Sequence, residues 1–485
     1  MGGGQTKVYT PGSGDDESLP SKDANETPLI RLVNLAHYLD HHVPADNVKC
    51  REALAEIMDL IKTYRDGMGL DGSSDVLSAI RGNKDFEGDD HVMSLVKQIA
   101  TPAVNDNARI LSGSLSRPRT IFKGQSSPGL ALNDNSIYNM AMEGQKVESI
   151  FDWDYDIHML NKVSNQNPLK IIFFAIIESL GLSNTIKISS EVVNNYVTAV
   201  ESGYRTSNPY HNRCHAADVV QATGHYLKLG SVKFTDLEKV ALIISSAVHD
   251  VEHPGVNNSF LVASGDHLAL AYNDNSPLEN HHVSSAFMIM QRDNCDVFAH
   301  VEKDIKKRLR SMIIRLVLAT DMAVSFQEVG KANNVFQENV LDLKKKNHVL
   351  QIMVMVIKLS DVSHPARNFE THFKWTQRCV EEFYLQGDKE KDLLKTEPLG
   401  FMDREKDYLP KSQWGFIKFV VVPMYATIKP IYPALHDSMS KNIENNIARW
   451  SSYMEKKSEV CVQKKLLESL IPENYDPDAI LAPEI

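Results

Sequence analysis

Two histidines four positions apart are the first residues whose types and spacing suggest chemistry. His211 and His215 follow Asn208 and Pro209. That pair favours a helix start, because asparagine caps a helix well and proline suits its first position. Residues at i and i+4 share one helix face, so we expect both imidazoles on the opening turns. Taken alone, such a pair is more simply explained as surface histidines or as hydrogen-bonded core histidines.

Acidic and imidazole groups also end two strongly apolar stretches. His249 and Asp250 follow the apolar residues 238–248, and Asp361 closes the apolar run 349–359. Such groups are costly to bury without partners. A metal ion satisfies both kinds of group, since neutral imidazoles and carboxylates are common ligands of divalent cations.

Taken together, these residues predict a binuclear metal site. The expected ligands are His215, His249, Asp250 and Asp361. Two imidazoles and two carboxylates suit zinc. The second oxygen of Asp250 can bridge to another cation, and a cation held largely by water would be magnesium or manganese. The four ligands converge only if their helices pack into one bundle.

The elements that must position these residues are predicted to be helices. Apolar residues recur with helical spacing, and almost nothing alternates with period two. The chain is therefore predicted to be all-α, with one compact multi-helix domain over residues 147–470 and the metal site between its helices. The periodic stretches are 168–182, 190–203, 216–229, 236–249, 282–292, 311–323, 347–361, 371–386, 412–428 and 437–456.

The flanking segments differ from this domain in composition. Residues 1–27 are polar and expected to be disordered, and residues 105–146 have the composition of a linker. Between them, residues 28–104 predict a short helical N-terminal extension, and residues 471–485 form a C-terminal tail. The extension suits a homodimerisation element, a regulatory segment or simple packing on the main domain, and the sequence leaves these alternatives open.

Composition excludes several classes of protein. The 485-residue chain has a net charge of −11, which argues against nucleic acid as the main partner. Its five cysteines are widely spaced without a CxxC pair, as is typical of a reducing compartment. The sequence has neither a membrane-length apolar run nor a secretory signal. We therefore expect a cytoplasmic location.

Six blocks of the sequence resemble, in the same order, the catalytic domain of class I 3′,5′-cyclic-nucleotide phosphodiesterases, within the wider HD-type metal phosphohydrolases. The resemblance covers residues 147–470. The blocks are YHNRCHAADV (210–219), HDVEHPG (249–255), LENHH (278–282), ATDM (319–322), KLSDVSHP (358–365) and SQWGF (412–416).

The resemblance implies hydrolysis of cyclic AMP, cyclic GMP or both to nucleoside 5′-monophosphates. It implies that the four ligands hold Zn²⁺, that Asp250 also reaches Mg²⁺ or Mn²⁺ at a second site, and that His211 is the general acid. These roles are chemically sensible, because two cations generate a hydroxide at neutral pH and an imidazolium can protonate the leaving alkoxide. Four residues would order the second ion's water shell: His253, Glu279, Thr320 and Asp321.

The same resemblance assigns the substrate pocket. Gln413 would hydrogen-bond the purine edge, and Phe416 would form one wall of an apolar clamp on the base. Tyr210 and His364 are further candidates for substrate contacts. Members of the family that are specific for cyclic AMP often have asparagine where this chain has His364, so we expect weak discrimination between cyclic AMP and cyclic GMP.

Three alternative interpretations compete with these roles. Ser276 with Glu279 three residues later matches a capping box, which would give Glu279 a role at a helix start instead. A general HD-type nucleotide phosphohydrolase is disfavoured by the block that contains Gln413 and Phe416. A non-catalytic nucleotide-binding scaffold is disfavoured because every expected metal ligand and His211 are present.

Two expectations concern partners and location. Calmodulin binds basic amphipathic helices, and the charges of the predicted helix 48–66 sum to zero, so calmodulin binding is not expected.

The first six residues fit the N-myristoylation pattern with Gly2 as acceptor, although a flexible glycine-rich start is the alternative. One acyl chain binds membranes only marginally. We therefore expect partial, peripheral membrane association, and a lipid-binding carrier would permit delivery to a cilium or flagellum.

Overall fold

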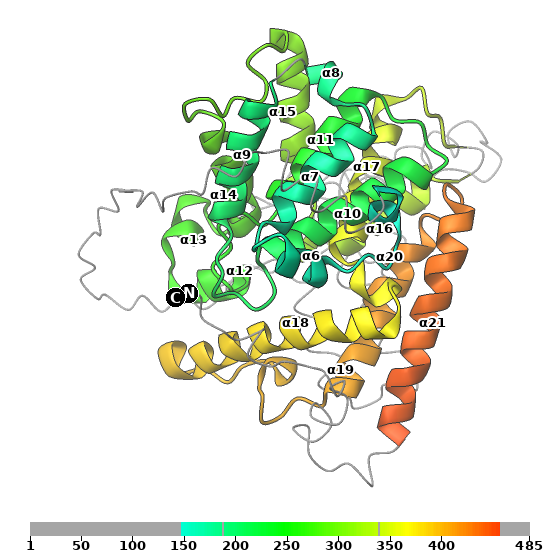
Figure 1. Ribbon diagram of the computed structural model, residues 1–485. Coiled ribbons are helices and arrows are strands. Elements are labelled where there is room, and N and C mark those ends of the chain that lie inside the picture. Colours follow the sequence, from blue (N-terminus) through cyan, green and yellow to red (C-terminus); the bar gives the residue numbers. More distant parts are fainter. Residues whose placement is uncertain (1–146, 187–188, 338–339, 456–485) are drawn as a thin grey trace, which may run out of the picture. The chain divides into compact units, whose positions relative to one another are not determined.

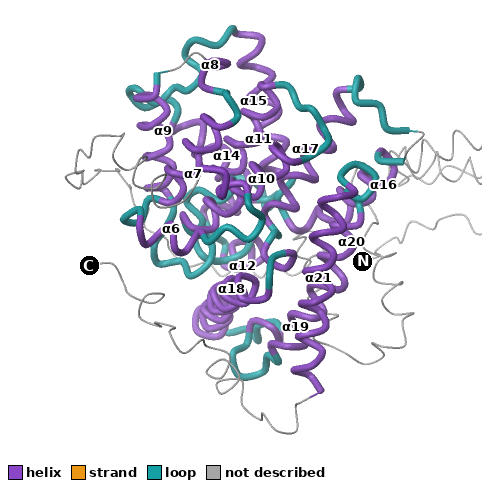
Figure 2. The backbone as a smooth tube through the Cα atoms, turned by 45° about the vertical axis from the view of Figure 1, so that its right-hand side comes forward, coloured by secondary structure: helices purple, strands orange, loops and turns teal. Residues whose placement is uncertain are grey.

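The protein is described by a computed structural model over residues 147–186, 189–337 and 340–455. Within these ranges every regular element is a helix, which confirms the all-α prediction (Figures 1 and 2). The predicted disordered start with Gly2, the helical extension 28–104, the linker 105–146 and the tail 471–485 lie outside the described residues.

The helices follow one another with short connections. Those labelled η are single 3₁₀ or π turns. In chain order the elements are η2 (Val147–Phe151), α6 (Ile157–Val163), α7 (Pro168–Ser179), α8 (Ser183–Ile186), α9 (Ser190–Gly203), α10 (Arg213–Leu229), α11 (Asp236–Val248), α12 (Asn258–Ser264), α13 (His267–Ala271), α14 (Pro277–Ile289), α15 (Lys303–Leu318), η3 (Met322–Val324), α16 (Ser325–Val335), α17 (Lys346–Asp361), η4 (His364–Ala366), α18 (Phe369–Lys389), η5 (Glu390–Leu394), η6 (Gly400–Met402), α19 (Leu409–Phe416), η7 (Ile417–Val421), α20 (Val422–Ala426) and α21 (Pro433–Glu455).

Helix α10 lies at the centre of the core. It packs against α7, α11 and α17, and its residues from Cys214 to Leu227 are all buried. Gly224 permits the close approach of α7, because a Cβ atom at this position would lie 2.6 Å from Cδ1 of Ile176. Helices α18, α19 and α21 lie together in the lower part of Figure 1. The central position of α10 matters because this helix supplies the first metal-ligand candidate.

The predicted periodic stretches correspond to the long helices, with two informative differences. Helix α15 begins at Lys303, well before the predicted residue 311, because its first two turns are largely exposed and carry almost no apolar periodicity. The stretch 412–428 is three elements rather than one. Pro423 has no amide hydrogen to donate to the preceding turn, and a π turn precedes it.

The short helices α6, α12, α13 and α16 were not predicted from the sequence. Helices α6, α12 and α13 are too brief for a hydrophobic repeat, and α16, with 11 residues, has few large apolar side chains. Within the described ranges, no helix combines the length and the apolar character that crossing a membrane requires.

Candidate metal centre and substrate pocket

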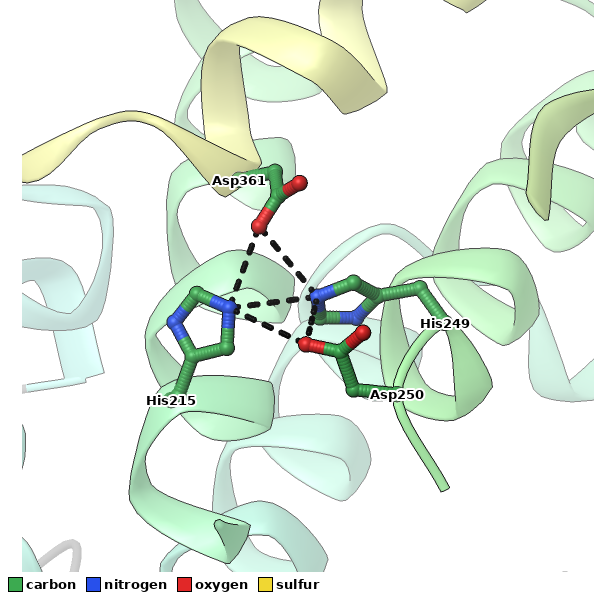
Figure 3. A group of neighbouring side chains, drawn as sticks. All are labelled: His215, His249, Asp250 and Asp361. Carbon is green, nitrogen blue, oxygen red and sulfur yellow. Dashed lines mark hydrogen bonds and ion pairs between the residues drawn. The ribbon is translucent and has the colours of Figure 1, made fainter. Parts of the chain in front are cut away.

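Four side chains converge where three long helices meet. Nε2 of His215 lies 3.1 Å from Oδ1 of Asp361 and 3.2 Å from Nε2 of His249. Oδ2 of Asp250 lies 3.4 Å from the His215 nitrogen and 3.1 Å from the His249 nitrogen. Figure 3 shows all four groups turned toward a common point. The sequence prediction of these four residues as one cluster therefore agrees with their placement.

Helix ends explain this convergence. His215 occupies the first turn of α10, His249 is the C-cap of α11, and Asp361 is the last residue of α17. Tyr204, at the end of α9, also fixes the end of α11. Its hydroxyl donates to the carbonyl of Ala247 at 2.9 Å and accepts the amide N–H of Asp250 at 3.4 Å. Groups at helix ends can approach one another without disturbing the packing of the helices.

The donor set fits a divalent cation. Ligand atoms about 2.0–2.1 Å from a tetrahedral zinc ion lie about 3.3–3.4 Å from one another, and the five separations that involve an imidazole nitrogen run from 3.1 to 3.4 Å. Burial disfavours a charged His249, but the carboxylates of Asp250 and Asp361 outweigh burial and raise its pKa. Such a pocket stabilises positive charge, and a metal ion can replace the proton there.

A second cation position is indicated beside Asp250. Nε2 of His282 is buried, has no hydrogen-bond partner among the described residues, and lies 3.7 Å from Oδ1 of Asp250. The Nδ1 atom of His282 is already bonded to the carbonyl of Val251 at 2.7 Å. Because Nδ1 carries the proton of this neutral ring, Nε2 is an unpaired acceptor, and Nε2 together with the second oxygen of Asp250 suits a water molecule attached to another ion.

The four residues assigned to that water shell lie around the same region. His253, Glu279, Thr320 and Asp321 all line the pocket that contains Asp250. Burial, followed by the negative charge of Asp321, raises the pKa of Glu279 to about 8. A nearby cation would favour the ionised form of Glu279. The hydroxyl of Thr320 donates to the carbonyl of Val317 at 2.7 Å, so it reaches a shell water only as an acceptor.

The capping-box alternative for Glu279 is wrong. Ser276 makes no capping hydrogen bond; its hydroxyl donates instead to Oδ2 of Asp321 at 2.6 Å. The amide N–H of Leu278 is satisfied by Oδ1 of Asn258 at 2.9 Å, so a distant asparagine serves the start of α14. Glu279 accepts a hydrogen bond from Nδ2 of Asn258 at 2.9 Å.

His211 lies before helix α10 rather than on it, which corrects the predicted helix start. The N-cap is Asn212, whose side chain accepts the amide N–H of Cys214. Asn208 instead donates from Nδ2 to the carbonyls of His211 at 3.0 Å and His253 at 2.8 Å. The rings of His211 and His253 consequently stack, with centroids 4.0 Å apart.

Glu382 on α18 is a site residue that the sequence prediction missed. Its Oε1 is hydrogen-bonded to Nδ1 of His211, and its Oε2 accepts the amide N–H groups of Tyr210 and His211, both at 2.9 Å. Burial opposes protonation of His211, but the charges of Glu382 and Asp250 outweigh it and raise the pKa of His211 to about 9. No local motif surrounds Glu382, so only a tertiary contact reveals it.

His211, His253 and Glu382 could also be considered a second metal triad, since their ligand atoms cluster. The direct hydrogen bond between His211 and Glu382 explains that grouping without an ion. Nδ1 of His253 is likewise engaged, accepting the amide N–H of Gly255 at 3.0 Å. We interpret the group as a positioned proton donor next to the metal ligands, with Nε2 of His211 4.0 Å from Oδ2 of Asp250.

The residues predicted to contact the substrate line the same pocket as the metal ligands Asp250 and Asp361. Tyr210, His364, Gln413 and Phe416 all line it. Phe416 is half-buried against the core, whereas Trp414 contacts the core and does not line the pocket. The apolar part of the lining includes Met322, Val324, Val362, Val380, Phe383, Phe401 and Met402. A cavity with an apolar wall and an amide such as that of Gln413 suits a planar heterocycle.

A hydrogen-bond relay fixes the tautomer of His364. Nε1 of Trp450 donates to Nε2 of His372 at 2.8 Å, and burial lowers the pKa of His372 to about 3. The proton of neutral His372 therefore lies on Nδ1, which donates to Nδ1 of His364 at 3.0 Å. His364 then carries its own proton on Nε2. Nearby, the hydroxyl of Thr376 donates to Oε1 of Gln413 across 3.4 Å.

Comparison with known proteins matches residues 210–442 to the family described as 3′5′-cyclic nucleotide phosphodiesterase. The chain is 36% identical over 322 residues to a probable 3′,5′-cyclic-AMP phosphodiesterase of Caenorhabditis elegans, covering 64% of this chain and 47% of the relative. It is 37% identical over 300 residues to the dual specificity calcium/calmodulin-dependent 3′,5′-cyclic nucleotide phosphodiesterase 1B of Homo sapiens and of Bos taurus, covering 60% of this chain and 55% of each relative. The chain spans about half the length of the curated relatives that it matches.

Proposed function

The chain belongs to the class I 3′,5′-cyclic-nucleotide phosphodiesterase family, and from that premise we propose that it hydrolyses 3′,5′-cyclic nucleotides to nucleoside 5′-monophosphates. The observation that supports this most is the joint placement of a four-ligand metal cluster and a His211–Glu382 pair in one pocket. Hydrolysis of a phosphodiester anion needs both charge neutralisation and a proton for the leaving oxygen.

The metal ligands have distinct tasks in this proposal. His215, His249, Asp250 and Asp361 would hold Zn²⁺, and Asp250 would also reach a second ion, Mg²⁺ or Mn²⁺. When bound, the two cations would neutralise the phosphate and lower the pKa of a water molecule. Glu279 and Asp321 would accept hydrogen bonds from water on the second ion, and so would Nε2 of His282, because the proton of that ring lies on Nδ1. The resident metals remain to be identified by elemental analysis of the purified protein.

His211 is the general acid in this proposal. Its raised pKa keeps the imidazole protonated at neutral pH, and its Nδ1–H is held by Glu382, so Nε2 carries the proton that faces the pocket. That proton passes to the ribose 3′ oxygen as its bond to phosphorus breaks. Glu382 then stabilises the orientation of the neutral ring for the next protonation.

Gln413 and Phe416 bind the base in this proposal, and both cyclic AMP and cyclic GMP are substrates. An amide can present either a donor or an acceptor after rotation. Among the described residues, the amide of Gln413 is hydrogen-bonded by the hydroxyl of Thr376 at 3.4 Å, a long contact that weakly favours one orientation. The relatives include both a probable cyclic-AMP phosphodiesterase and dual specificity enzymes, which agrees with a site that accepts either purine.

The decisive experiment measures hydrolysis of cyclic AMP and cyclic GMP by the full chain, with and without a chelator, followed by metal restoration. Turnover that the chelator abolishes and metals restore supports the proposal. Metal-dependent hydrolysis of other nucleotides, without cyclic-nucleotide hydrolysis, would favour a general HD-type phosphohydrolase. Nucleotide binding without turnover in the metal-loaded protein would favour a scaffold.

We also propose that the protein is cytoplasmic and partly membrane-associated through an acyl chain on Gly2, with a cilium or flagellum as a destination that a lipid-binding carrier could serve. The supporting observation is the N-terminal sequence pattern. Cell fractionation of the native chain beside Gly2→Ala tests it, and identical distributions without acyl mass would exclude it.

Homodimerisation and the absence of calmodulin binding remain predictions, checked by solution mass and by calmodulin pull-down with calcium.

A further inference from the structure

We propose that Lys358 and Ser276 are positioning residues that together hold Asp321 at the second cation site. This inference rests on the proposed metal-dependent function and adds two residues to it. Lys358 holds the backbone of Asp321, and Ser276 holds its carboxylate, from two different elements. We refer to Lys358 and Ser276 as the Asp321 clamp.

Lys358 is a buried lysine whose ammonium group is hydrogen-bonded to backbone carbonyls at and just after the end of α15. It lies on α17, one turn before the ligand Asp361, and only 2% of it is exposed. Its Nζ donates to the carbonyl of Ala319 at 2.7 Å and to that of Asp321 at 3.3 Å. Burying an ammonium group costs several kcal/mol unless it is well paired. An apolar residue would fill the core without this desolvation cost. We therefore infer that the role of Lys358 is to position these two carbonyl groups.

The acceptors of Lys358 lie where α15 ends and the pocket begins. Ala319 is the C-cap of α15, and the last carbonyls of a helix lack partners within the helix. A cation at this end also complements the helix dipole. Lys358 therefore links the end of the helix that precedes Thr320 and Asp321 directly to α17, which carries Asp361.

Ser276 constrains the same aspartate from the opposite side. Its backbone has φ of 42°, a left-handed conformation that is strained for a residue with a side chain. Although it precedes α14, its hydroxyl does not cap that helix and donates to Oδ2 of Asp321 at 2.6 Å. The other oxygen, Oδ1, accepts the amide N–H of Ala323 at 2.8 Å. Both carboxylate oxygens and the backbone carbonyl of Asp321 are thus fixed.

A clamp of this kind should affect the second ion and leave the first unchanged. The first-site ligands come from α10, α11 and α17, and neither clamp residue is hydrogen-bonded to them. Residues that orient a metal's outer contacts typically change its affinity by ~10–100-fold when they are replaced. A purely structural role would instead lower thermal stability without separating the two ions.

The test uses two variants with matched controls. Ser276→Gly removes the hydroxyl while suiting the left-handed backbone, so folding is not threatened. Asn273→Gly is its control, because Asn273 has φ of 52° in the same loop and does not line the pocket. Lys358→Met removes the ammonium group. Its control is Tyr425→Phe, which deletes another buried hydrogen bond to α17, from the Tyr425 hydroxyl to the carbonyl of Leu359.

The measurement is Mn²⁺ binding, by the loss of the free-ion electron paramagnetic resonance signal, to full-length protein loaded with one equivalent of zinc. We expect Ser276→Gly and Lys358→Met to raise the Mn²⁺ dissociation constant ~10–100-fold at unchanged zinc content, while both controls bind as the native protein does. Restoration of affinity in Ser276→Asn, which keeps a donor and tolerates positive φ, would support positioning.

Three outcomes overturn the clamp: native Mn²⁺ affinity in Ser276→Gly, equal loss in Ser276→Gly and Asn273→Gly, or parallel loss of zinc and manganese in Ser276→Gly. The Ser276→Gly result decides the matter if Lys358→Met does not fold. Because binding is measured without substrate, failure of the clamp is distinguishable from failure of the proposed function. A native protein that binds Mn²⁺ tightly, loses it in the variants, and hydrolyses no cyclic nucleotide would keep the clamp and reject the function.

Discussion

Glu382 is hydrogen-bonded to Nδ1 of His211 although 171 positions separate the two residues. The same carboxylate also accepts the backbone N–H groups of Tyr210 and His211, so both the ring and the backbone of His211 are fixed by α18. A carboxylate behind an imidazole favours the charged ring and sets which nitrogen faces the pocket. The contact between Glu382 and His211 therefore influences how the proposed reaction depends on pH.

The first prediction concerns that pH dependence. With the pKa of His211 raised to about 9, the acid stays protonated at neutral pH, and turnover should fall as pH rises through about 9. Glu382→Gln removes the charge that raises this pKa, so the decline should move to lower pH. Rates measured from pH 6 to pH 10 check this, with the loss in the variant greater at pH 8 than at pH 6. An alkaline limb at the same pH in both proteins would contradict the assignment.

The second prediction concerns the proton itself. His211→Ala should lower kcat by ~10²–10⁴-fold, the usual contribution of a positioned acid, while metal content stays native. The loss should be smaller for an analogue whose leaving group is more acidic, because such a group needs less protonation. Equal losses for the two substrates would argue that His211 has another role.

The clustering of His215, His249, Asp250 and Asp361 could be predicted from the sequence, because each lies at or next to one end of a long periodic helix. His249 and Asp361 interrupt apolar runs, and a charged group at the end of a buried helix needs a partner. Asn208 was misassigned as an N-cap, since its side chain binds the distant carbonyl of His253 instead. Glu382 had no local signal, because its place on α18 has meaning only after α18 packs beside residues 210–211.

The third prediction concerns the metal cluster. Asp361→Ala should abolish turnover and remove zinc together, because the ligand set holds the ion jointly. Metal content by mass spectrometry, measured beside activity, checks both parts. Ser360→Ala is a suitable control, since Ser360 is buried next to Asp361 and its Oγ accepts a hydrogen bond from Thr223 at 3.1 Å, away from the cluster. Near-native activity in metal-free Asp361→Ala would refute the site.

The fourth prediction concerns stability and the buried carboxyl of Glu201. Burial raises its pKa to about 7 from the ordinary 4.5, so the folded state binds more protons than the unfolded state between these values. Its contribution is fully present below about pH 4.5 and is lost as pH rises through 7. Glu201→Gln keeps an acceptor for the amide N–H of Leu169, which Oε1 of Glu201 binds at 2.8 Å. We expect it to be more stable than the native protein at pH 8, by about 1–3 kcal/mol, and denaturant unfolding at pH 5 and pH 8 checks the difference.

The last prediction concerns purine selectivity. The long Thr376–Gln413 contact restrains the Gln413 amide only weakly, so the amide can turn to complement either the adenine or the guanine edge. The ratio of kcat/KM between cyclic AMP and cyclic GMP should therefore stay below ~10³, which corresponds to about 4 kcal/mol. Gln413→Ala should lower kcat/KM for both nucleotides by a similar factor, about 10–100-fold, because each loses hydrogen bonds to the same group. Steady-state kinetics on both substrates decide the matter. A larger ratio in the native protein, or a loss in Gln413→Ala confined to one nucleotide, would mean that the pocket presents the amide in one fixed orientation.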